Sequence, residues 1–127
     1  MIKIKIMYWK EIPIQILVED STKKYSVELD ARFQQAADSI AMFDGSMGTD
    51  EYLDGWQWKE SKSNMTLEVA IDKLTTYYNQ GMPDNFVAQI RDQIKNGTRN
   101  ESPGSIEKWI NDENPIEDSL NAFNRIN

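Results

Sequence analysis

The chain has neither histidine nor cysteine among its 127 residues. These absences exclude Ser–His–Asp triads, Cys–His dyads, and metal sites built from imidazole or thiolate. They also exclude a disulfide framework, which is compatible with the reducing cytoplasm where we expect the protein to reside. The sequence therefore predicts no cofactor and no metal ion, gives catalysis no support, and favours a protein that is not an enzyme.

Positive charge is in the minority, with 14 Lys and Arg against 21 Asp and Glu and a net charge of -7. Nucleic-acid binding depends on clustered basic side chains, so we expect no nucleic-acid partner. No apolar run approaches the roughly 20 residues of a membrane span, and Met1–Met7 alternates apolar and basic residues as a strand does. We therefore expect no membrane partner.

The hydrophobic content of 39% suits one domain with a real core. Alternation of apolar and polar residues predicts strands over 2–8, 14–18 and 25–29, and a short strand over 56–58. Pro13 lacks an N–H group and predicts a bend, a sheet edge or a strand start before the second strand.

Apolar residues at helical spacing predict helices over 31–43, 67–78 and 83–96, the second closed by Asn79-Gln80-Gly81. Helices packed on a mainly antiparallel sheet describe an α+β fold. We expect an α+β domain over 1–96, a linker over 97–104 and a short helical tail over 105–127.

Four blocks stand out in the first two-thirds of the chain: Tyr8–Gln15, Leu29–Asp38, Ala41–Met42 and Thr49–Trp56. In order and spacing they resemble a small bacterial domain family called virulence factor, which has a Tyr-Trp-basic-acidic-Ile-Pro-x-Gln signature. Genes of this family often lie beside those for folate- and corrinoid-dependent methyl transfer. The resemblance therefore implies an accessory role in one-carbon metabolism, and it supplies no catalytic residues.

The candidate binding residues are aromatic and charged side chains within or beside these blocks. At the end of the first strand, the aromatics either pack while the charges are solvated, or they form a surface for a ligand or partner. A block arginine either forms surface ion pairs or recognises an anion, and two tryptophans on one strand face are either core anchors or binding residues. The full set is Tyr8, Trp9, Lys10, Glu11, Arg32, Trp56 and Trp58.

Our leading hypothesis is an accessory protein that binds another protein, and the resemblance points to an enzyme of methyl transfer as the partner. Apolar side chains of the tail need a groove, which we assign with a slight preference to the partner rather than to this domain. These side chains are Ile106, Trp109, Ile110, Leu120 and Phe123.

Two alternatives of other classes stay open. In the first, Trp9, Arg32, Trp56 and Trp58 line a pocket for a planar anion such as a folate, in a binding protein or an enzyme subunit. In the second, the protein is structural and forms assemblies, and the hint is an exposed sheet edge that Pro13 would guard.

Overall fold

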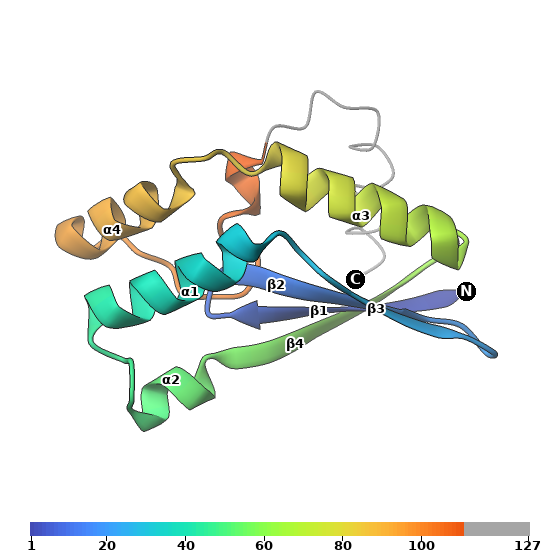
Figure 1. Cartoon of the computed structure of the whole chain (residues 1–127), viewed down its shortest axis with the longest axis horizontal. Coiled ribbons are helices and arrows are strands. Elements are labelled where there is room, and N and C mark those ends of the chain that lie inside the picture. Colours follow the sequence, from blue (N-terminus) through green and yellow to red (C-terminus); the bar gives the residue numbers. More distant parts are fainter. Residues whose placement is uncertain (111–127) are drawn as a thin grey trace.

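A computed structural model describes residues 1–110, which form a four-stranded antiparallel sheet with α1, α3 and α4 on one side of it (Figure 1). The strands follow the order β3-β2-β1-β4. The elements are β1 (Ile2–Trp9), β2 (Ile12–Glu19), β3 (Lys24–Glu28), α1 (Ala31–Asp44), α2 (Asp50–Asp54), β4 (Trp56–Ser63), α3 (Leu67–Gly81), α4 (Phe86–Asn96) and the 3-10 turn η1 (Glu107–Trp109). The predicted α+β fold is confirmed. None of the helices within 1–110 combines the length and apolar character that a membrane crossing requires.

The core lies between the sheet and the helices. Alternate residues of β1 and β2 point into it and meet the apolar stripe of α1, because strand side chains alternate between faces while helical stripes repeat every three to four residues. The fully buried contributors from these three elements include Ile4, Ile16, Val18, Phe33, Ala37 and Ile40.

Pro13 lies within β2, a central strand, rather than at a sheet edge. The register between β1 and β2 slips after Met7, which pairs with Gln15, so that Tyr8 pairs with Pro13 at a bulge. Pairing of β2 with β3 begins only at Gln15, so no neighbour on that side needs the N–H that proline lacks. The expected bend is this bulge, and Pro13 stands where β2 has no partner on the β3 side, so its guarding of this local edge stays a prediction.

The strand predicted over 56–58 continues to Ser63 and forms the edge strand β4. Its second half, Lys59–Ser63, is polar because an edge strand needs few apolar side chains, and hydrophobic alternation therefore misses it. Trp58 is 46% exposed, so its expected role as a core anchor is wrong, whereas Trp56 packs partly buried against the core.

Residues 97–110, which we call the returning segment, run from α4 back to the sheet (Figure 1). Ile106 and Ile110 are buried in this domain's own core, and Trp109 is partly buried against it. This corrects our preference for a partner's groove at these three positions. Leu120 and Phe123 lie outside the described residues, so their docking stays a prediction.

Candidate functional site

The turn between β1 and β2 consists of Lys10 and Glu11 alone, and Lys10 has a positive φ of 50°. Glycine is the usual residue at such a turn position, and a non-glycine residue there typically costs on the order of 1–3 kcal/mol. The Lys10 N–H donates to the Gly55 carbonyl at 2.8 Å, which holds the turn against the start of β4. A strained backbone at this point indicates that the lysine side chain is needed where it lies.

The Lys10 ammonium and the Arg99 guanidinium bind carboxylates from four parts of the chain. Lys10 Nζ lies 3.0 Å from Asp44 Oδ2, 3.0 Å from Glu51 Oε2 and 2.8 Å from Glu101 Oε1. The Arg99 guanidinium donates to both carboxylate oxygens of Glu11, at 2.7 and 2.8 Å, and also to Asp44 Oδ2 at 2.9 Å. We call Lys10, Glu11, Asp44 and Arg99 the charge cluster; Glu51 and Glu101 lie at its exposed end.

Burial makes this cluster unusual for charged side chains. Glu11 has no exposed surface, and the side chains of Lys10, Asp44 and Arg99 are each less than one-tenth exposed. Desolvation opposes the charged form of Asp44, but hydrogen bonds from Ser46, Arg99 and Lys10 outweigh it and lower its pKa to about 2. Desolvation of Lys10 is likewise outweighed by Glu101, Asp44 and Glu51, which raise its pKa to about 12. The expectation that the charges of this turn are solvated is therefore wrong.

Trp9 is completely buried and joins the turn to α2. Its indole Nε1 donates to the Tyr52 carbonyl at 2.9 Å, and its ring centroid lies 5.6 Å from that of Tyr52, which also meets Trp56 edge-on. A Cβ added at Gly55 would lie 2.8 Å from Trp9 Nε1, so only glycine fits there. Trp9 is thus placed to pack rather than to meet a partner at the surface.

Tyr8 belongs to a second buried group, which we call the tyrosine cluster. Tyr8 and Tyr78 donate from their hydroxyls to the two carboxylate oxygens of Glu107, each at 2.7 Å. Burial raises the pKa of Glu107, although the two hydroxyls and the charge of Lys59 act in the opposite direction. Burial, with the charge of Glu107 beside them, also raises the pKa of both tyrosines well above the usual value.

Arg32 lies elsewhere, beside the end of α3. It donates to the carbonyls of Asn79 and Met82, both at 2.9 Å, and its guanidinium stacks over Phe33 and Phe86. A helix leaves its last carbonyls without partners, and Arg32 satisfies them. Its Nε lies 3.8 Å from Asp30 and its Nη1 3.8 Å from Asp84, so the surface ion pairs predicted as one alternative for this arginine are present as long contacts.

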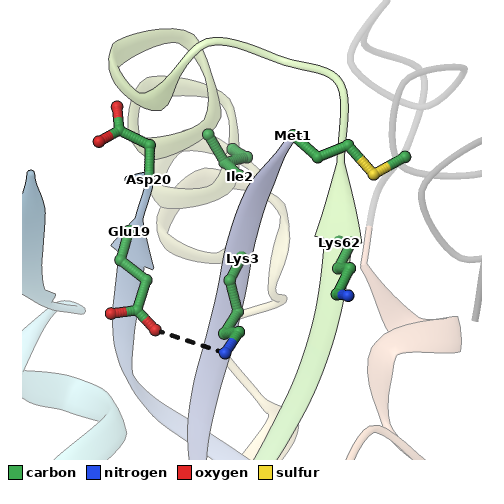
Figure 2. A pocket seen from close by; sticks show the side chains of 6 residues that line it. All are labelled: Met1, Ile2, Lys3, Glu19, Asp20 and Lys62. Atoms are coloured by element: carbon green, nitrogen blue, oxygen red, sulfur yellow. Dashed lines mark ion pairs between the residues drawn. The ribbon is translucent and has the colours of Figure 1, made fainter. Parts of the chain in front are cut away.

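The structure does not assemble the folate-like pocket. Arg32 caps α3, Trp9 and Trp56 surround Tyr52, and Trp58 lies on the face of the sheet opposite the helices, paired with Met7. A hollow of about 420 Å³ does lie at the start of β1, but Figure 2 shows that no aromatic side chain lines it. Its lining residues are Met1, Ile2, Lys3, Glu19, Asp20 and Lys62.

Several residues of the site could not be predicted from the sequence. Arg99 and Glu101 stand in a polar stretch that has the composition of a solvated surface, and Asp44 and Glu107 are single charges beside apolar residues. A single charge in such a stretch gives no sign of burial. Within residues 1–110, no group of three or more metal-ligating side chains is placed to hold an ion.

Comparison with known proteins gives one match. A family model described as "Virulence factor" matches residues 7–80, more than half of the chain. The matched range contains Tyr8, Lys10, Glu11 and Asp44, and it ends before the returning segment. No curated protein and no solved structure matches the chain significantly.

Proposed function

The chain belongs to the virulence factor family, and from this premise we propose that it is a non-catalytic accessory protein that binds another protein. The observation that carries the proposal is Trp58, which is 46% exposed on the uncovered face of the sheet. Tryptophan is enriched among the residues that dominate binding energy at protein interfaces. Of the predicted binding residues, it is the aromatic one with the most surface to offer a partner.

The surroundings of Trp58 support a protein surface. Met7 lies directly opposite on β1, Gln15 of β2 lies beside Met7, and Leu17 pairs with Lys5 in the next row of the same face; Met7, Gln15 and Leu17 are partly buried. Next to these side chains, Lys3, Lys5, Glu19 and Glu60 form long ion pairs of 3.9 to 4.0 Å. An apolar centre with a polar rim is the usual anatomy of a protein interface.

The partner we propose to test first is an enzyme of folate- or corrinoid-dependent methyl transfer in the cytoplasm, because the family resemblance implies that association. The alternatives carry less support. The folate-like pocket is not assembled, and the stretch of β2 at Pro13 that lacks a partner on the β3 side is only two residues long, Ile12 and Pro13, before Ile14 accepts from Leu29.

The test is co-purification of the tagged full chain from its own organism, followed by binding to the purified enzyme that it recovers. Trp58→Ser should weaken binding at least about tenfold, because a buried tryptophan anchor typically contributes 2 kcal/mol or more. Tyr25→Ser is the matched control, since Tyr25 is equally exposed, at 49%, on the edge strand β3. Thermal melts should show both variants folded. Recovery of the chain alone, or equal binding by the two variants, would contradict the proposal.

A further inference from the structure

A second apolar surface lies where α1 ends and α2 begins. Met42, Phe43, Met47 and Leu53 are 65%, 44%, 40% and 66% exposed, and they account for four of the eight exposed large hydrophobic side chains within residues 1–110. We call them the α1–α2 corner, at the left of Figure 1. Exposed apolar side chains are ordinary when scattered, whereas these four come from twelve consecutive residues around one connection between two helices.

The corner is built on an ordered backbone. Gly45 ends α1 with a φ of 83°, and the Met47 N–H then donates to the Ala41 carbonyl at 3.0 Å. The Tyr52 hydroxyl contacts Asp38 of α1 at 3.5 Å, which ties α2 to α1. A surface held in one shape loses little conformational entropy when a partner docks.

The charge around the corner is negative on its α2 side. Asp50, Glu51 and Asp54 are all exposed on α2. Lys10 and Arg99, which contact Glu51 and its neighbours, supply two positive charges against the four carboxylates of Glu11, Asp44, Glu101 and Glu51 itself, a surplus of two negative charges (4 − 2). The surplus faces outward, because Glu51 and Glu101 are 64% and 54% exposed. On the other side, Arg91 and Lys95 of α4 lie over the Phe43 ring, so that flank of the corner carries positive charge.

We propose that the α1–α2 corner docks an amphipathic segment of a partner protein whose apolar side is bordered by lysine or arginine. The segment's apolar side chains cover Met42, Met47 and Leu53, and its basic side chains meet the carboxylates of α2. Methionine suits this task because its flexible thioether adapts to different apolar partners. The corner uses none of the residues around Trp58, so it is a surface additional to the proposed one.

The test uses the full chain and two labelled synthetic helical peptides. Both carry the same leucine positions, and their polar positions are lysine in one and glutamate in the other. Fluorescence anisotropy should show the lysine peptide binding at least about tenfold more tightly than the glutamate peptide. Leu53→Ser and Met42→Ser should each weaken the lysine peptide about tenfold, and Asp54→Asn should weaken it about threefold and reduce its salt dependence.

Matched variants on α3 separate docking from general attraction to an acidic protein. Val69→Ser removes an apolar side chain that is 43% exposed, and Asp72→Asn removes an exposed carboxylate. Both should leave the affinity of the lysine peptide unchanged. Equal effects at the corner and on α3, equal binding of the two peptides, or no binding of the lysine peptide at millimolar concentration would overturn the proposal. These results are independent of Trp58→Ser, which reports on the other surface.

Discussion

The charge cluster and the tyrosine cluster each bury a carboxylate near the end of β1: Glu11 in the turn that follows the strand, and Glu107 in contact with Tyr8. Both clusters include residues of the returning segment. They bury the carboxylate by different chemistry. In the charge cluster, Glu11 and Asp44 contact a guanidinium directly, and Asp44 keeps a pKa of about 2. In the tyrosine cluster, Glu107 accepts two neutral hydroxyl hydrogen bonds, and its pKa is raised by burial. At Asp44, hydrogen bonds from Ser46, Arg99 and Lys10 together outweigh the cost of burial, whereas at Glu107 the cost of burial outweighs two hydroxyl hydrogen bonds and the charge of Lys59.

The largest expected effect comes from Arg99→Ala, which removes the guanidinium from the charge cluster. Glu11 would then be buried without the cation that binds both of its oxygens, and breaking a buried ion pair costs about 3–5 kcal/mol. Urea denaturation monitored by tryptophan fluorescence measures the loss. Arg91→Ala is the control, because Arg91 makes a single hydrogen bond to Ser39 and should cost less than about 1.5 kcal/mol. Similar losses for both variants would show that the cluster contributes no special stability.

The next largest effect is expected when one carboxylate in each cluster is replaced by an amide. Glu11→Gln should cost about 2–3 kcal/mol, because it removes a bidentate pair and leaves Arg99 partly unpaired. Glu107→Gln should stay within about 1 kcal/mol at neutral pH, since an amide can still bond to the two tyrosines without the cost of a buried charge. The same denaturation measurement decides. If Glu107→Gln were the more damaging variant, our account of the difference between the clusters would be wrong.

The pH dependence of stability should have opposite signs in the two clusters. The lowered pKa of Asp44 gives stability above its ordinary value near 3.8, and this stability is lost as the pH falls towards 2. The raised pKa of Glu107 gives stability below its ordinary value near 4.5, and this stability is lost as the pH rises through the raised pKa. Melting temperatures between pH 2 and 8 should therefore show a shallower acid loss in Asp44→Asn and a steeper one in Glu107→Gln. Slopes that change in the same direction would contradict the assignment.

The smallest effect should come from the exposed charges of the sheet. Glu60 contacts Lys3 at 4.0 Å and Lys5 at 3.9 Å, and its side chain is 50% exposed. Water and salt screen such pairs, so Glu60→Gln should change the free energy of unfolding by less than about 0.5 kcal/mol. Denaturation at low and high salt checks this value. A loss comparable with that of Glu11→Gln would mean that burial does not set the strength of ion pairs here.

Much of the fold could be predicted from the sequence, because strands and helices leave periodic apolar patterns. The alternation of Ile2, Ile4 and Ile6 and the stripe of Phe33 and Ile40 identify β1 and α1 directly. β4 shows the limit, since its polar second half belongs to an edge strand whose pairing with β1 is set by backbone hydrogen bonds rather than by apolar side chains.

The candidate site was much harder to predict. The sequence singled out Tyr8, Trp9, Lys10 and Glu11, and the structure places all four within the interior. Their partners, Arg99 and Glu107, come from a stretch whose polarity indicates a linker and tail. Each of these charges is buried because a partner comes from far along the chain, and no local sequence pattern indicates such a long-range contact.

The separation of the partners along the chain also determines when their contacts can form during synthesis of the protein. Glu11 and Arg99 are separated by 88 positions, and Tyr8 and Glu107 by 99. At about 5–20 residues per second, a ribosome takes about 4–18 s to pass from Glu11 to Arg99. Throughout that interval Glu11 of the newly made β1–β2 hairpin must stay in water, because Arg99, which binds both of its oxygens, has not yet been made. Closure of the core is therefore a late event in the synthesis of this chain, and long-range contacts of this kind are slow to form.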